Sequence, residues 1–260
     1  NRELEVAKIA KKHNIPLFLP SKPSEIIDDL YTLDADIAIL VSYGRIISQN
    51  VIDIFPKGII NVHPSLLPKY RGPTPIESAI RNGDDKTGVS IMKLSAGMDE
   101  GPVYAQTRVQ IAQNDEKFEV YEKIVDASVK LLLDCLPQII EGTLKPIDQK
   151  HNEATYSKMI FKSDGIIDWN KSATHLANDI RAFKGWPQSR AKLGDIDVII
   201  TKAHTTNDSG KPGSIYIEND TSLVVNTSNG QVSIDALKPL GKKEMPVTAF
   251  LAGYKSKINL

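Results

Sequence analysis

The sequence has very little cysteine and no long apolar run. Cys135 is the only cysteine among the 260 residues, so the chain cannot form a disulfide framework, and a reducing compartment such as the cytosol is favoured. Its place in the apolar run LLLDCL predicts a small core residue. No stretch approaches the roughly 20 apolar residues that a membrane-spanning helix needs. Because there is a single cysteine, a small extracellular domain stabilised by disulfides is excluded.

The charges show no excess of either sign. Lys and Arg number 32, as do Asp and Glu, so overall charge gives no argument for a nucleic-acid partner. The five histidines are scattered without paired ligand spacing, so no metal site is predicted. A composition of 41% hydrophobic and 25% charged residues is ordinary for a globular protein. A length of 260 residues favours two domains.

The first half of the chain alternates between helical and strand-like patterns. Apolar spacing near 3.6 residues indicates helices, whereas short runs of branched apolar residues indicate strands, of which residues 36–42 read as buried on both faces. This alternation predicts an α/β fold with a doubly wound, mostly parallel sheet. Strands are expected at 36–42, 58–63, 88–94 and 102–111, and helices at 3–13, 24–33, 74–83 and 115–135.

Two helices carry more detailed expectations. In the first, Thr74 is expected to form a capping box with Glu77, and Gly83 is expected to end the helix. In the second, apolar side chains are expected to face a core. They are Phe118, Tyr121, Ile124, Val125, Leu131 and Leu132.

The pattern changes after Lys145. Residues 146–165 are polar and weakly periodic, as in a linker with a short turn or two. A helix capped by Ser172 follows. Beyond Trp186 come short strand-like runs, including a hairpin signal at Asn229-Gly230, which predict a small antiparallel barrel or sandwich.

We therefore divide the chain into three parts. Residues 1–145 form a catalytic domain, residues 146–165 form the linker, and residues 166–260 form a small C-terminal β-domain.

Asn61 and His63 end an apolar strand pattern. Their spacing of two places both side chains on one face of a strand, and ligands of doubly wound sheets collect at the carboxyl ends of strands. An amide beside an imidazole could stabilise a developing oxyanion. On spacing alone, however, such a histidine is more often a structural residue.

Asp99 lies in a loop bracketed by Gly97 and Gly101, where backbone can approach a ligand closely. A lone acidic residue in such a loop is usually part of a turn. Beside His63, its carboxylate would favour the charged form of the imidazole and select its tautomer.

The stretch from Asn61 to Gly101 resembles the signature region of the folate-dependent formyltransferases. That family has an Asn-x-His-x-Ser-Leu-Leu-Pro segment followed about 35 residues later by an Asp loop. The resemblance extends from about residue 3 to the C-terminus. The segments IDWNKSATHLANDIRAFKGWPQS and LKPLGKKEMPVTAFLAGYK are similar to the second, OB-like barrel domain of the branch that acts on initiator tRNA.

The resemblance implies a formyl group moving from 10-formyltetrahydrofolate to the methionine amine of initiator methionyl-tRNA. Asn61 and protonated His63 would stabilise the oxyanion, while Asp99 would keep His63 protonated or position a water. Folate would bind along the strip 65–68 and in a pterin pocket. The residues implied are Ser65, Leu66, Leu67, Pro68, Tyr43, Gly44, Ala96, Gly97 and Met98. A cytoplasmic monomer is expected, bacterial or else from an organelle matrix.

Several alternatives stay open. The family begins with a strand, a glycine-bearing turn, a helix, a second strand and a basic loop used on tRNA; this βαβ portion is not found here, so we expect residues before Asn1. Arg71 could meet the tRNA acceptor end or cap a loop. Lys238, Lys242, Lys243 and Lys255 could contact RNA phosphates or form a solvated cluster. Other folate-dependent formyltransferases, a formyltetrahydrofolate hydrolase and a catalytically silent RNA-binding protein are the rival functions.

Overall fold

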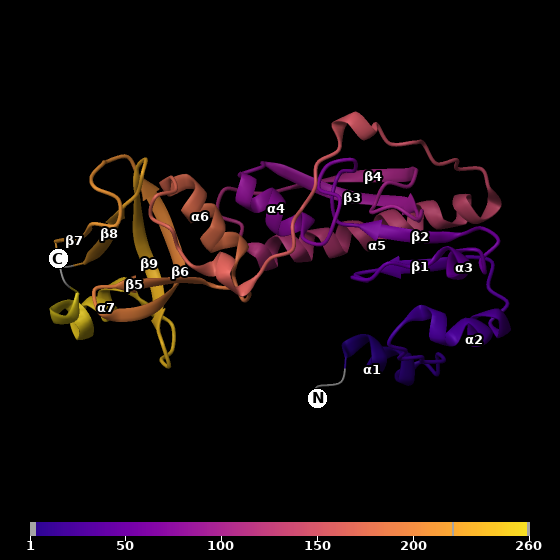
Figure 1. The fold of residues 1–260 in the computed structure, drawn as a ribbon, viewed down its shortest axis with the longest axis horizontal. Coiled ribbons are helices and arrows are strands. Elements are labelled where there is room, and N and C mark those ends of the chain that lie inside the picture. The colour runs from indigo at the N-terminus through magenta and orange to yellow at the C-terminus, as the bar shows by residue number, and fades with distance from the viewer. Residues whose placement is uncertain (1–3, 220, 259–260) are drawn as a thin grey trace.

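The computed structural model describes residues 4–219 and 221–258, which form two β-sheets with helices between and around them (Figure 1). The first sheet has the strand order β1-β2-β3-β4. Only β1 and β2 are parallel; β3 runs antiparallel to β2, and β4 to β3. The expected α/β class is confirmed, but among the described strands the parallel part is a single pair. The strands are β1 (Ala38–Val41), β2 (Ile59–His63), β3 (Lys86–Lys93) and β4 (Val103–Gln110).

The core of the first sheet lies between β2, β3 and two helices. It gathers apolar side chains of the strands with those of α4 and α5, and includes the buried Cys135, as the sequence predicted. Burial raises the pKa of the Cys135 thiol, which suits a packing residue. The helices of this part are α1 (Glu5–Lys12), α2 (Ile27–Thr32), α3 (Gln49–Ile52), α4 (Pro75–Asn82) and α5 (Lys117–Glu141).

The strand expected to be buried on both faces is half exposed. In β1, Ile39 and Val41 are 43% and 57% exposed. Among the described residues, β1 pairs with β2 alone, and it is the face of Ala38 and Leu40 that packs against a core cluster. The prediction for residues 36–42 was therefore right about the strand and wrong about its burial.

The two detailed helix expectations are only partly confirmed. Gly83 ends α4 in the left-handed conformation, with φ of 72°. The capping box is wrong, because the Thr74 hydroxyl donates to the Lys158 carbonyl and Glu77 turns toward α5. In α5, the buried face is that of Val120, Ile124, Cys135 and Ile139. The opposite face leaves Phe118, Tyr121 and Val125 exposed, which corrects their expected orientation.

The second sheet is antiparallel, as the sequence predicted. Its strands follow the order β5-β6-β9-β8-β7, with β10 added beside β9. The Asn229-Gly230 hairpin joins β8 to β9, and Ser172 caps α6 by accepting from the backbone of His175. The elements are α6 (Ala173–Ala182), β5 (Ser189–Leu193), β6 (Ile196–Thr206), β7 (Ile215–Glu218), β8 (Ser222–Asn226), β9 (Gln231–Pro239), β10 (Met245–Pro246) and α7 (Val247–Tyr254).

The segment between α5 and α6 returns across the first sheet before it reaches the second (Figure 1). It contains the two short 3₁₀ turns His151–Glu153 and Lys162–Gly165. It also bonds the loop after β2: the Arg71 amide donates to the Thr155 carbonyl, and the Ser157 amide donates to the Arg71 carbonyl. A segment that the sequence marks as a linker is therefore packed against the part of the chain that forms the first sheet.

None of the helices that the structure describes is long and apolar enough to span a membrane.

Ile39 and Ile60 are partners in the β1–β2 register, so the two isoleucines differ in burial at matching strand positions. Ile60 is fully buried, whereas its partner Ile39 is 43% exposed. We expect Ile60→Ala to lower the free energy of unfolding by about 2–5 kcal/mol, because it leaves a cavity in the core. Ile39→Ala should cost less than about 1 kcal/mol. Urea unfolding measures both; equal losses would contradict this description of the core.

Candidate active site

The strand β2 supplies two polar side chains from inside the protein. All five of its residues are buried, and Asn61 and His63 are only 9% and 4% exposed. Since alternate residues of a strand point to the same face, the amide and the imidazole lie on one side of the sheet. A polar group at this depth needs partners, because an unsatisfied one costs about 1–3 kcal/mol.

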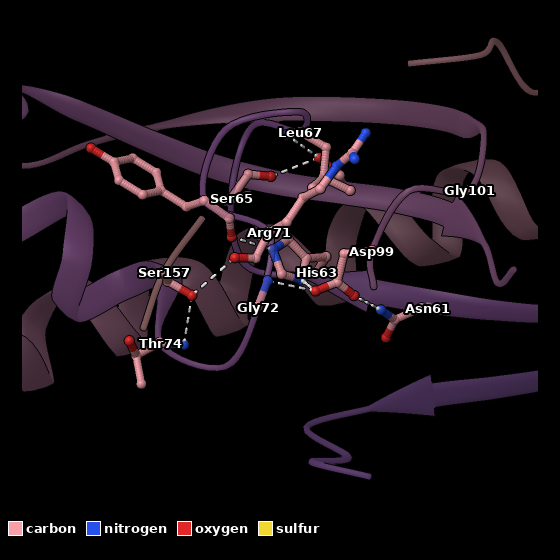
Figure 2. A network of polar contacts seen from close by, with 12 residues as sticks. Asn61, His63, Ser65, Leu67, Arg71, Gly72, Thr74, Asp99, Gly101 and Ser157 are labelled. Atoms are coloured by element: carbon pink, nitrogen blue, oxygen red, sulfur yellow. Dashed lines mark hydrogen bonds and ion pairs between the residues drawn. The ribbon is translucent and has the colours of Figure 1, made fainter. Parts of the chain in front are cut away.

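Asp99 comes from the loop between β3 and β4 and meets both side chains (Figure 2). Its Oδ1 lies 3.4 Å from Asn61 Nδ2, which donates to it. Its Oδ2 accepts a hydrogen bond of 2.8 Å from the Gly72 amide and lies 3.7 Å from His63 Nδ1. The three residues predicted from the sequence are thus brought together. Their catalytic roles remain a prediction.

The tautomer of His63 follows from its second partner. His63 Nε2 lies 3.0 Å from the carbonyl oxygen of Tyr70. A carbonyl can only accept, so Nε2 carries a hydrogen and, in the neutral ring, Nδ1 presents its lone pair toward Asp99.

The net pKa of His63 runs against the sequence-based expectation. Burial lowers the pKa of His63 below its ordinary value of 6.5, while the Asp99 carboxylate and the Tyr70 carbonyl raise it by less. Asp99 thus acts in the predicted direction, but desolvation acts against it more strongly. That Asp99 holds the ring protonated remains a prediction.

Hydrogen bonds of buried serine hydroxyls hold the Ser65–Pro68 strip in place. Ser65 is fully buried, and its hydroxyl donates to the Lys69 carbonyl at 2.6 Å. Ser90 holds the strip from β3, since its hydroxyl donates to the Ser65 carbonyl and accepts from the Leu67 amide. Leu67, 5% exposed, also points inward. Ser65 and Leu67 are placed to shape the strip, and the Ser65 hydroxyl is occupied.

The other two residues of the strip are partly exposed, and Leu66 leans over β3. A Cβ on Gly88 would lie 2.4 Å from Leu66 Cδ2, so only glycine permits this approach. Leu66 and Pro68 are thus the members of the strip with surface that a ligand could touch.

The predicted pterin-pocket residues lie on two loops at the rim of the site. Tyr43 and Gly44 follow β1, which runs parallel to β2 with Val41 opposite Val62. They therefore lie at the same carboxyl end of the strands as His63. Tyr43 is 40% exposed. On the Asp99 loop, Met98 is 59% exposed, and Ala96 and Gly97 precede it. Folate binding by these residues remains a prediction.

Sequence reasoning missed the residues that hold the three together. Tyr70 contributes a backbone carbonyl, Gly72 a backbone amide, and Gln149 clasps the Asp99 loop from the segment after α5. Backbone groups leave no residue-type signal, and a glutamine in a polar segment gives none that stands out. Within residues 4–219 and 221–258, no three His, Cys, Asp or Glu side chains gather so as to hold a metal ion.

Solved structures share this fold. A sugar 3N-formyl transferase, WlaRD, matches with a TM-score of 0.69 and 21% identity, over 92% of this chain and 82% of that one. HypX from Aquifex aeolicus, solved with tetrahydrofolic acid, matches with a TM-score of 0.66 and 21% identity, over 92% and 42% of the two chains. At such identities the likeness establishes the fold alone.

Relatives found by sequence similarity identify the family of the chain. The formyl transferase family model matches residues 5–136, and the model of the formyl transferase C-terminal domain matches residues 159–255. Methionyl-tRNA formyltransferase of Sulfurihydrogenibium sp. (strain YO3AOP1) is 38% identical over 97% of this chain and 83% of its own. That of Staphylococcus aureus (strain MW2) is 33% identical over 97% and 83%. The chain therefore belongs to the methionyl-tRNA formyltransferase family, with both the formyl transferase domain and its C-terminal domain.

Proposed function

We propose that the protein transfers the formyl group of 10-formyltetrahydrofolate to the amino group of methionine on initiator tRNA. The observation that carries the proposal is the convergence of Asn61, His63 and Asp99 at the edge of the sheet, in a chain whose relatives are named for this reaction. The reaction belongs in the cytoplasm, where translation begins.

The transfer makes one C–N bond and breaks another. The methionine nitrogen bonds to the formyl carbon, and the bond from that carbon to the folate nitrogen breaks. Nδ1 of His63 takes the proton from the amine and returns it to the departing folate nitrogen, so the ring ends neutral. The Asp99 carboxylate, 3.7 Å from Nδ1, stabilises the transient imidazolium.

Asn61 stabilises the formyl oxygen as it becomes negative. One hydrogen of its amide points to Asp99, which leaves the second available for the oxyanion. A donor of this kind is worth about 10²–10³ in rate. With Asn61 aimed by Asp99 and His63 aimed by Tyr70, both groups are oriented before the substrates arrive.

The rim of the site suits a folate donor. Leu66, Pro68 and Met98 offer apolar side-chain surface, Gly44 is exposed, and Gly97 is partly exposed. A flat pterin ring needs such apolar contact together with backbone donors and acceptors. HypX, which has the same fold, was solved with tetrahydrofolic acid.

An RNA acceptor is supported by a basic cleft on the C-terminal domain. The cleft, of about 370 Å³, is lined by the end of α6 and by β5, β6 and β9. Lys238, Lys242 and Lys243 line it and have no ion pair with any described residue, whereas Lys184 is bound to Glu116. These lysines share the lining with the carboxylate of Glu244, and the net positive charge suits contact with RNA phosphates.

The proposal is tested by incubating the protein with 10-formyltetrahydrofolate and charged initiator tRNA. We expect N-formylmethionine on the tRNA. Folate release without tRNA formylation would identify a hydrolase and contradict the proposal. Formylation of an amino sugar in place of the tRNA would contradict it too.

Variants of the site should separate chemistry from folding. We expect His63→Ala and Asp99→Asn each to lower kcat by about 100-fold or more, because proton transfer and its countercharge are lost. Circular dichroism should show both folded. His204→Ala is the matched control: this exposed histidine pairs with Asp235 on the second sheet, and its loss should leave kcat unchanged. Near-normal kcat in either site variant would refute the assigned role.

The rate should depend on pH through neutral His63. Its pKa lies below 6.5, so the neutral, proton-accepting form predominates above pH 6.5 and is lost as the pH falls through that pKa. The methionine amine also titrates, and His63→Gln, measured in parallel, keeps only that contribution. We expect the ratio of the two single-turnover rates to level off toward high pH and to fall on acidification below pH 6.5. A ratio that rises on acidification would mean that the protonated ring is the active form.

A further inference from the structure

Among the arginines that the structure describes, Arg71 alone is buried, and it has no carboxylate partner. It is 2% exposed, so it cannot reach the surface to meet the tRNA acceptor end. Its Nε and Nη2 donate to Gln149 Oε1 at 3.1 and 2.8 Å, and Nη2 also lies 3.2 Å from His151 Nδ1. The two charge-assisted hydrogen bonds from the buried guanidinium therefore hold Gln149 Oε1 strongly.

These two hydrogen bonds fix the orientation of the Gln149 side-chain amide. With Oε1 held by Arg71, Nε2 must point the opposite way, where it donates to the Asp99 carbonyl at 2.8 Å and the Gly101 carbonyl at 2.7 Å. Both hydrogens of Nε2 are used, and Gln149 is only 8% exposed. The amide is therefore satisfied in one orientation only, and in that orientation it clasps the turn that carries Asp99.

The turn needs such a clasp. Asp99 has a φ of 50°, in the left-handed region that a non-glycine residue adopts at a cost. The backbone of Arg71 acts on the same residue from the other side. It is bonded to the backbone of Thr155 and Ser157. The amide that follows it, that of Gly72, donates to the Asp99 carboxylate (Figure 2). Asp99 is thus gripped through its backbone and its side chain.

We propose that Arg71 and Gln149 are positioning residues for formyl transfer, which act by holding the Asp99 carboxylate beside His63. This inference rests on the proposed function. Neither residue touches a reacting atom. Displacement of Asp99 by about 1 Å would lower the rate by up to about 100-fold.

Two variants remove the clasp in different ways. Gln149→Glu keeps an acceptor for Arg71 but has no hydrogens for the Asp99 and Gly101 carbonyls. The double variant Arg71→Met/Gln149→Met removes the buried cation together with its acceptor, so that no buried charge is left unpaired. The control is Lys150→Ala, at the next position, where only an exposed ion pair with Glu153 is lost.

In both clasp variants we expect kcat to fall by about 10- to 100-fold, with the KM for tRNA within twofold of the parent. Lys150→Ala should match the parent. The idea is overturned if the clasp variants keep the parent kcat, or if kcat falls only where the melting temperature drops below that of the assay, since a purely structural role would do that.

A readout without substrate separates this proposal from the proposed function. Histidine NMR follows the titration of His63 in the parent protein and in Gln149→Met, which keeps the Arg71 charge and removes the donors to the Asp99 turn. Because Asp99 raises the pKa of His63 in the intact site, the midpoint should move to lower pH once Asp99 is released. An unchanged midpoint refutes the clasp even if formyl transfer is active; a shifted midpoint with no formyl transfer would leave the clasp standing and refute the function.

Discussion

The contact between the Asp99 carboxylate and the Gly72 amide is the one on which the site depends. It joins the β3–β4 loop to the turn after β2 and leaves the carboxylate 3.7 Å from His63 Nδ1. Gly72 has a φ of 106°, and a Cβ there would lie 2.9 Å from the Ser157 carbonyl. Only glycine can present its amide to Asp99 while the segment after α5 lies so close.

A balance between burial and charge gives His63 its chemistry. Burial holds the ring neutral at rest, so its lone pair is ready to accept a proton, and the nearby carboxylate limits the cost of the charged ring during transfer. The enclosure of β2 supplies the first effect and the Asp99 loop supplies the second. Neither effect alone would produce a base that can both accept the proton and release it.

Much of the fold and the centre of the site could be predicted from sequence, for identifiable reasons. Apolar periodicity located β2, β3, β4, α5 and α6, and the spacing of Asn61 and His63 placed them on one face. The exposure of β1 could not be foreseen, because burial depends on which strands become neighbours. The lowering of the His63 pKa was not foreseen, because it depends on the depth of burial, which no spacing reveals. Gln149 was missed because its importance comes from contacts with residues 50 and 78 positions away.

The coupling between His63 and Asp99 is tested most directly by a double-mutant cycle on kcat/KM for methionyl-tRNA. The cycle compares His63→Ala, Asp99→Asn and the double variant with the parent protein. If Asp99 acts on the reaction through His63, its replacement should cost little once the imidazole is gone, and the double variant should be about as slow as His63→Ala alone. Losses that simply multiply would show that the two residues act independently, and would contradict the account.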